Sequence, residues 1–256
     1  MRELHRFLIA LGYFTRLPVP AWVGWSSFEL NRATRYFPLV GLLVGSVAAA
    51  SLWVALQFWT GPIAVLLSML VSLLLTGAFH EDGLADSADG FGGGWEKAKV
   101  LAIMKDSRIG TYGAVALVCA LLLKFAALDA LGWQALLALP LVHAASRVPP
   151  LLIMAFMAYV REDDSTRAKP VAEGLGMTEW VTGSLLGLLP LACAVALGLL
   201  APLRAVGLLL VLAAAGLICA LYFRQRLAGY TGDALGAAQQ VCELTSYLAL
   251  CAHGMA

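Results

Sequence analysis

Charged residues are scarce in this sequence. Asp, Glu, Lys and Arg together make up 13% of its 256 residues, whereas a typical soluble domain carries about 25%. The formal net charge is +1, and no basic face carries interleaved aromatic residues. These absences argue against a soluble domain and against a nucleic-acid-binding protein. Hydrophobic residues account for 61% of the chain, which indicates a protein of the lipid bilayer.

Three further features are missing. The apolar runs do not alternate with period two, which argues against a membrane β-barrel and leaves helices as the spanning elements. We also expect no cleavable signal peptide, since the apolar residues 7–14 lead into Arg16, Pro18 and Pro20 instead of a small-residue cleavage site. Close cysteine pairs are lacking, so we interpret the cysteines as small core residues. They are Cys119, Cys193, Cys219, Cys242 and Cys251.

Seven stretches are apolar enough and long enough to cross a hydrocarbon core of about 30 Å as helices. They cover residues 36–59, 62–79, 112–131, 133–159, 180–200, 205–223 and 241–255. We therefore predict an all-α, polytopic transmembrane bundle of about six to seven spans. No long linker, low-complexity tract or internal repeat divides the chain, so residues 1–256 are predicted to form a single integral membrane domain.

Positive charges are distributed unevenly along the chain. With a cytoplasmic N-terminus, residues 1–35, 80–111, 160–179 and 224–240 fall on the cytoplasmic side, and 14 of the 17 Lys and Arg residues lie there. The positive-inside rule therefore predicts this topology, in the cell inner membrane. Nearly all acidic residues lie in the same segments, so the active site is expected to face the cytoplasm.

The N-terminal segment, residues 1–35, begins with an amphipathic pattern. Apolar residues recur at helical spacing opposite a polar face, which predicts a helix lying in the membrane surface. An ordinary packing helix explains the pattern equally well. The apolar residues are Leu4, Phe7, Leu8, Leu11 and Phe14, and the polar ones are Arg2, His5 and Arg6.

The most informative stretch is FHEDGLADSADG at residues 79–90. On a helix, Asp82, Asp86 and Asp89 stand at i, i+4 and i+7, so the three carboxylates project from one stripe. Such like charges repel unless a cation neutralises them, and carboxylate oxygens suit Mg²⁺ or Mn²⁺. The run follows a predicted span, at whose C-terminal end the helix dipole disfavours acids. We therefore favour a metal site over a solvated acidic helix end.

A second polar stretch, MKDSRIGTYG, covers residues 104–113. Lys105 and Arg108 are three residues apart, so they can share a face, and we predict that both bind substrate phosphates. Asp106 is a further candidate metal ligand. Anchoring the next span at the membrane surface is the alternative role of the two cations. Residues 80–111 are therefore predicted to form the cytoplasmic catalytic loop and helix.

Together the two motifs resemble those of the cobalamin synthase family, the adenosylcobinamide-GDP ribazoletransferases. FTRLPVP at residues 14–20, RYFPLVG at 35–41 and GDALGA at 232–237 agree, and the resemblance covers essentially the whole chain. It implies a Mg²⁺-dependent membrane enzyme in which α-ribazole or its 5′-phosphate displaces GMP from adenosylcobinamide-GDP. The product is adenosylcobalamin or its 5′-phosphate. Whether the protein forms a homo-oligomer stays open.

The resemblance also implies roles for individual residues. The ribazole 3′-hydroxyl attacks the phosphorus that carries the corrinoid arm, while Mg²⁺ on Asp82, Asp86 and Asp89 neutralises the diphosphate. Asp89 is the preferred candidate for the base that takes the hydroxyl proton. Arg108 is expected to act in catalysis, and His80 to bind substrate.

Other polar residues lie in costly or exposed places. His143 and Arg147 are four apart in the fourth predicted span, so they are expected to face the bundle and bind phosphates or corrinoid amides, unless Arg147 lies at the membrane boundary. Arg167 and Lys169 are expected to contact the substrate, although binding to lipid headgroups explains them equally well. Asp233 precedes a predicted helix, where it could bind metal or cap the helix.

Two other classes of function remain as alternatives. A transporter for a phosphorylated or cationic solute normally has its ionisable site near the bilayer midplane, with matching features in two repeated halves. Here the acids cluster at one predicted surface, and no repeat is evident. A non-catalytic membrane scaffold, the other alternative, does not require three carboxylates on one stripe.

Overall fold

The computed structural model describes residues 2–24, 26–160 and 174–252. Within those ranges every regular element is a helix, and an isolated bridge joins Tyr159 and Tyr230. The α-helices are α1 (Arg2–Phe14), α2 (Ser27–Ala33), α3 (Phe37–Ala55), α4 (Gly61–Thr76), α5 (Phe79–Gly93), α6 (Lys97–Met104), α7 (Thr111–Leu131), α8 (Ala135–Ala145), α9 (Val148–Phe156), α10 (Met177–Ala196), α11 (Pro202–Leu227) and α12 (Gly232–Cys251). The 3₁₀ turns are η1 (Ala21–Val23), η2 (Thr34–Tyr36) and η3 (Gly132–Gln134). The predicted all-α fold is confirmed.

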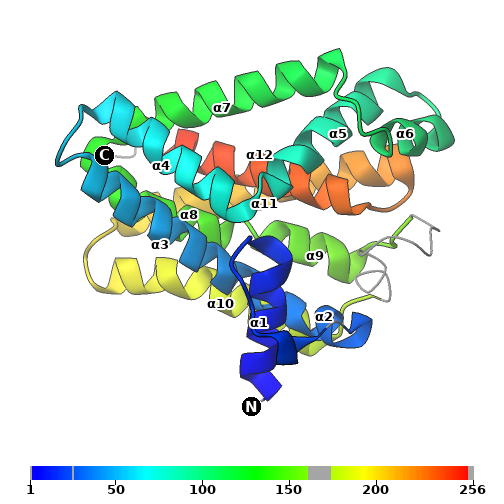
Figure 1. Cartoon of the computed structure of the whole chain (residues 1–256), viewed down its shortest axis with the longest axis horizontal. Coiled ribbons are helices and arrows are strands. Elements are labelled where there is room, and N and C mark those ends of the chain that lie inside the picture. Colours follow the sequence, from blue (N-terminus) through cyan, green and yellow to red (C-terminus); the bar gives the residue numbers. More distant parts are fainter. Residues whose placement is uncertain (1, 25, 161–173, 253–256) are drawn as a thin grey trace.

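Most long helices run along the long axis of the molecule, and α1 stands across them (Figure 1). Helix α3 packs on α4 and α8, while α12 packs on α5, α7 and α11. Close approach between α3 and α8 depends on the small residues Gly41 and Gly45. A Cβ on Gly45 would lie 2.5 Å from the Leu139 carbonyl oxygen, so a larger residue would push α8 away.

Within the described residues, four helical stretches are long and apolar enough to span a membrane, or five if the bent pair α4 and α5 forms one span. One of them, Thr111–Phe156, has 46 residues and contains a turn at Gly132. At about 1.5 Å per residue, 46 helical residues exceed twice the thickness of the hydrocarbon core. Membrane-type helices are therefore confirmed, whereas the count of six to seven spans stays a prediction.

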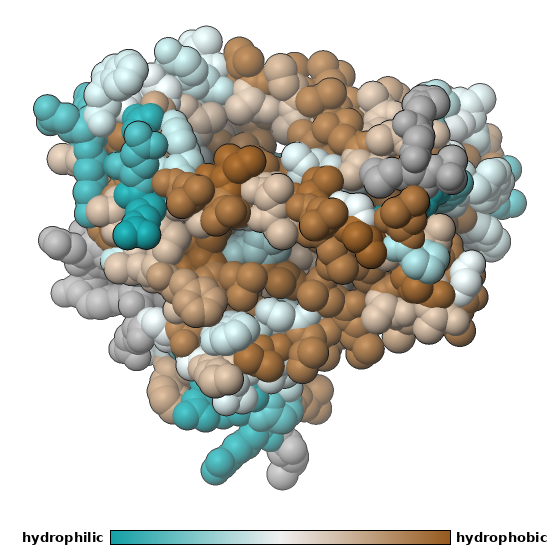
Figure 2. All heavy atoms as spheres, turned by 180° about the vertical axis from the view of Figure 1, so that it is seen from behind, coloured by the Kyte–Doolittle hydropathy of each residue, from teal (hydrophilic) through white to brown (hydrophobic). Residues whose placement is uncertain are grey.

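The described parts of the four segments predicted to be cytoplasmic lie together, and the stacked rings of Phe14 and His80 join the first segment to the second. Asn31 Nδ2 donates to the Gly174 carbonyl oxygen at 3.1 Å, which joins the first segment to the third. Arg226 Nη2 donates to the Phe91 carbonyl oxygen at 3.1 Å, which joins the fourth to the second. Figure 2 shows apolar surface over the middle of one face and hydrophilic groups gathered toward its edges. The sidedness of this polar end stays a prediction.

Helix α1 packs against the following segment through its polar residues. Arg6 is buried, and its Nε donates to Glu29 Oε2 of α2 at 2.8 Å. His5 lies 2.6 Å from the Val23 carbonyl oxygen through its Nε2 atom. Part of the polar side of α1 therefore packs against the protein, which agrees with the alternative that α1 is an ordinary packing helix. Leu4, from the apolar side, is 57% exposed.

Candidate active site

Helix α5 carries the acidic motif and begins after a sharp break in the chain. Gly77 and Ala78 have φ angles of 66° and 56°, and the axes of α4 and α5 differ by 86°. Glu81 and Asp82 therefore lie in the first turn of a new helix, where the helix dipole favours acids. The prediction that these acids sit at the C-terminal end of a span was wrong, because a break invisible in the hydropathy pattern starts a second helix.

The three aspartates of the motif do lie on one continuous helix with the predicted i, i+4 and i+7 spacing. Asp82 is exposed, and Asp86 and Asp89 are half-buried. An adjacent side of α5 packs tightly on α12. A Cβ on Gly83 would lie 2.8 Å from the Asp233 carbonyl oxygen, so glycine is required at this crossing.

Asp233 lies in the first turn of α12 beside α5. The helix is capped by Thr231, whose Oγ1 accepts a hydrogen bond from the Ala234 amide at 3.1 Å. The capping alternative for Asp233 was therefore wrong, because the hydroxyl two residues earlier takes that position. A metal-binding role for Asp233 stays a prediction.

Asp89 connects α5 to the start of α7. Its Oδ2 accepts a hydrogen bond from the Gly110 amide at 2.7 Å, and its Oδ1 accepts one from the Gly113 amide at 2.9 Å. Gly110 is the N-cap residue of α7, and first-turn amides have no partners within their own helix. The carboxylate also faces the positive end of the helix dipole. Asp89 thus holds the two sequence motifs together.

The chain between α6 and α7 contains the predicted phosphate-binding cations. Lys105 and Arg108 lie in this connection, so the prediction of a shared helical face was wrong: α6 ends at Met104. Arg108 is exposed and its Nη2 pairs with Asp106 Oδ2 at 2.7 Å. Hydrogen bonds from the side chain and backbone of Arg108 lower the pKa of Asp106 to about 2. Asp106 is therefore ionised at neutral pH and paired with Arg108.

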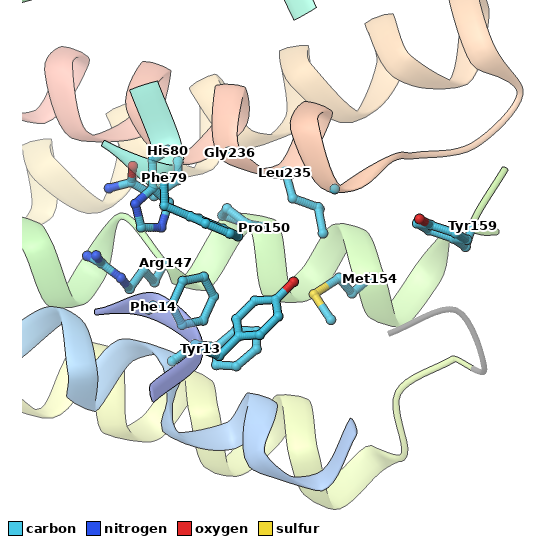
Figure 3. Close-up of a pocket in the computed structure, with 13 residues that line it drawn as sticks. Tyr13, Phe14, Phe79, His80, Arg147, Pro150, Met154, Tyr159, Leu235 and Gly236 are labelled. Carbon is cyan, nitrogen blue, oxygen red and sulfur yellow. The ribbon is translucent and has the colours of Figure 1, made fainter. Parts of the chain in front are cut away.

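A cavity opens among α1, α3, α5, α9 and α12 (Figure 3), with a volume of about 570 Å³ including the open space at its mouth. We call it the aromatic cavity. It is lined by Tyr13, Phe14, Phe37, Phe79, His80, Arg147, Pro150, Met154, Tyr159, Gly232, Leu235, Gly236 and Gln239. The rings of Phe14 and His80 stack with their centroids 5.4 Å apart. Burial and the neighbouring Tyr159 and Asp233 raise the pKa of Tyr13 to about 12, so its hydroxyl stays protonated.

His143 and Arg147 lie where the fourth predicted span is broken. Helix α8 ends at Ala145 and α9 begins at Val148. Arg147 is 4% exposed and His143 is 6% exposed, so both face the interior of the bundle as expected. Arg147 Nη1 donates to the His143 carbonyl oxygen. Arg147 also lines the aromatic cavity, whereas contact of either residue with substrate stays a prediction.

Sequence reasoning did not identify a buried ionic network next to the acidic motif. Lys124 Nζ of α7 lies 2.9 Å from Glu243 Oε1 of α12 and 3.8 Å from Glu81 Oε1 of α5. Gln240 Oε1 accepts from Lys124 Nζ at 3.1 Å, and Gln239 Nε2 donates to Glu243 Oε2 at 2.6 Å. Lys124 and Glu243 could have been singled out from the sequence, because ionisable residues in apolar helices are energetically costly and usually have a role. The sequence did not indicate that these two residues pair with each other.

The donor chemistry of α5 fits a Mg²⁺ ion shared with substrate. Asp82 and Asp86 offer hard oxygens one helical turn apart, and Mg²⁺ commonly uses one or two carboxylates, waters and substrate phosphates. Among residues 2–24, 26–160 and 174–252, no group of three or more His, Cys, Asp or Glu side chains is arranged to hold an ion. An open site completed by a phosphate therefore fits better than a closed cage. The predicted substrate residues Arg167 and Lys169 lie outside the described residues.

Comparisons with known proteins agree with the motifs. A family model described as cobalamin-5-phosphate synthase matches residues 6–251. The adenosylcobinamide-GDP ribazoletransferase of Leptothrix cholodnii is 47% identical over 253 residues, covering 97% of this chain and 95% of that protein. The protein of the same name from Shewanella sp. strain W3-18-1 is 46% identical over 256 residues, covering 97% and 94%. No solved structure matches the chain. With a family model that matches nearly the whole chain, and both motifs held together by Asp89, the chain belongs to the cobalamin-5-phosphate synthase family.

Proposed function

We propose that this chain transfers the adenosylcobinamide phosphate of adenosylcobinamide-GDP to the 3′-hydroxyl of α-ribazole or its 5′-phosphate, with Mg²⁺ as cofactor. GMP leaves, and adenosylcobalamin or its 5′-phosphate forms, in late cobalamin biosynthesis. The reaction takes place at the polar end of the bundle, which we assign to the cytoplasmic face of the inner membrane. Membership of the family supports the reaction, because relatives of nearly equal length are named for it.

The observation that carries the site assignment is the contrast between the two sides of α5. The side with Gly83 is fixed against α12, whereas Asp82, about 100° further around the helix, is exposed. The helix dipole favours an acid in this first turn, and the exposure of Asp82 also leaves its carboxylate accessible to a cation. We therefore assign Asp82 and Asp86 to Mg²⁺, which when bound neutralises the diphosphate and stabilises charge on the leaving phosphate.

Asp89 is reassigned in this proposal. Both of its oxygens accept backbone hydrogen bonds at the start of α7, so it positions the second motif beside the first. The base that takes the 3′-hydroxyl proton is then Asp82 or Asp86, which we also assign to the Mg²⁺ site. Arg108 is exposed and lies two residues before Gly110, which Asp89 binds. If the Arg108 guanidinium let go of Asp106, it could bind a phosphate of the substrate.

The transporter alternative is not favoured. Its strongest support is the buried network of Lys124, Glu81 and Glu243, since ionisable groups inside a bundle can mark a solute path. Lys124 lies between the two acids, and the family relatives are named for a transfer reaction. We therefore assign the network to the stability of the fold.

The experiment uses purified full-length protein in lipid nanodiscs, supplied with adenosylcobinamide-GDP, α-ribazole and Mg²⁺, with GMP release as the readout. Asp82→Asn and Asp86→Asn should each lower the rate by about 100-fold or more, as losses of transition-state electrostatics do. Asp129→Asn is the matched control, because Asp129 is an exposed aspartate at the other end of α7. Full activity in both α5 variants would reject the assignment. Omission of Mg²⁺ should abolish turnover.

A further inference from the structure

Arg147 is a buried cation that lacks a carboxylate partner in the described part of the chain. Its side chain makes one hydrogen bond, from Nη1 to the His143 carbonyl oxygen, and its Nε has no partner among the described residues. Glu243 attracts Arg147 electrostatically, but its polar contacts among the residues that the structure describes are with Lys124, His143 and Gln239 and not with the guanidinium. A buried guanidinium without an acceptor is costly, so a bound ligand is the natural source of one.

The aromatic cavity defines the shape of that ligand. Its walls are mostly apolar and include the aromatic side chains of Phe14, Phe37 and Phe79. Figure 3 places Arg147 and His80 at one end of the cavity and Tyr159 at the other. A phosphate suits such walls poorly, because its charge would lose water along the apolar surfaces. A flat aromatic ring suits aromatic walls of this kind and a single buried donor at its edge.

The two aromatic groups of the proposed reaction differ at their edges. Guanine presents two adjacent acceptors, O6 and N7, and a guanidinium binds this pair in a bidentate manner. A benzimidazole base offers no such pair. Resting on the proposed function, we infer that the aromatic cavity binds the guanine base of the nucleotide, with Arg147 donating to O6 and N7.

The position of the cavity fits a nucleotide that reaches the acidic motif. Phe79 and His80 line the cavity from the first turn of α5, and Asp82 lies in the same turn. Three residues of a helix rise by about 4.5 Å, which is shorter than a nucleotide. A nucleotide whose base enters the cavity therefore extends its phosphates toward Asp82. The guanine site and the proposed Mg²⁺ site thus belong to one binding groove.

The test measures equilibrium binding of GMP, 7-deaza-GMP and AMP to the full-length protein in nanodiscs. 7-Deaza-GMP lacks only the N7 acceptor, and AMP has an amino donor in place of O6. The wild-type protein should bind GMP about tenfold more tightly than either analogue. In Arg147→Lys the preference for GMP over 7-deaza-GMP should fall to about twofold or less, because a lysine on a shorter, flexible side chain lacks the planar fork of donors that matches the two acceptors. Arg204→Lys, at the far end of the bundle, should keep the full preference.

Equal wild-type affinity for the three nucleotides would overturn the inference without any variant, so a misfolded Arg147→Lys protein does not block the test. Weakened α-ribazole binding with unchanged GMP preference in Arg147→Lys would also overturn it, by assigning the cavity to the other base. Turnover separates this inference from the proposed function. A preserved guanine preference without GMP release rejects the reaction alone, whereas normal GMP release with equal nucleotide affinities rejects the guanine site alone.

Discussion

Two neighbouring carboxylates in the first turn of α5 have opposite surroundings. Glu81 is directed into the bundle, where its Oε1 lies 3.8 Å from Lys124 Nζ. Asp82, the next residue, is exposed at the polar end. The inward-facing acid is paired with a buried lysine, which we assign to stability, whereas the exposed acid is open to a cation and a substrate. Charge count alone does not separate these roles; burial and partners do.

The largest effect is expected from removing Lys124, the buried cation that contacts Glu81. Lys124→Met would leave Glu81 and Glu243 buried without their cation, which typically costs about 3–5 kcal/mol. Thermal unfolding in a mild detergent should show a large loss of stability. Adding Glu243→Gln to Lys124→Met should recover part of it, because fewer uncompensated charges remain. An unchanged unfolding temperature in Lys124→Met would contradict a structural role for the network.

The next largest effect is expected on activity, from replacing the exposed Asp82. Asp82→Asn should lower GMP release by about 100-fold or more at nearly unchanged stability. Glu81→Gln should do the reverse, with a lower unfolding temperature and activity that recovers when the protein is kept cold. The pair is well matched, since each variant replaces one carboxylate by its amide on the same helical turn. If both variants lost stability equally and activity equally, the division of roles between the two acids would be wrong.

The sequence predicted those features of the fold and the site that depend on neighbouring residues, and missed those that depend on contacts between distant helices. Helical periodicity was enough to put Asp82, Asp86 and Asp89 on one stripe of α5. The break before α5 was not predicted, because Ala78 adopts a left-handed φ that its residue type disfavours and tertiary packing imposes. The partner of Lys124 was likewise hidden, since Gln240 lies 116 positions away. Pairings of that kind depend on how helices pack, which one sequence does not specify.

A smaller effect is expected at Asp89, which tests positioning against base catalysis. Asp89→Ala would remove both acceptors at the start of α7, which should cost about 1 kcal/mol, as losing a helix cap does. Asp89→Asn keeps one acceptor oxygen, so it should retain most of the wild-type kcat. Steady-state GMP release across a range of α-ribazole concentrations separates kcat from KM. A loss of kcat in Asp89→Asn as large as in Asp82→Asn would restore Asp89 as the base.

The smallest effect is expected at the exposed ion pair between α6 and α7. The pKa of Asp106 is lowered to about 2 by Arg108, so this pair is intact above pH 4 and is lost only as the pH falls toward 2. It should therefore add no pH dependence to the rate between pH 6 and 9. Because exposed pairs contribute little, Asp106→Asn should change kcat/KM by less than about threefold. Arg108→Gln should reduce kcat/KM more strongly, since it removes the cation that we assign to phosphate. Equal, small effects of both substitutions would leave Arg108 with a surface role only and confine phosphate binding to the α5 side of the site.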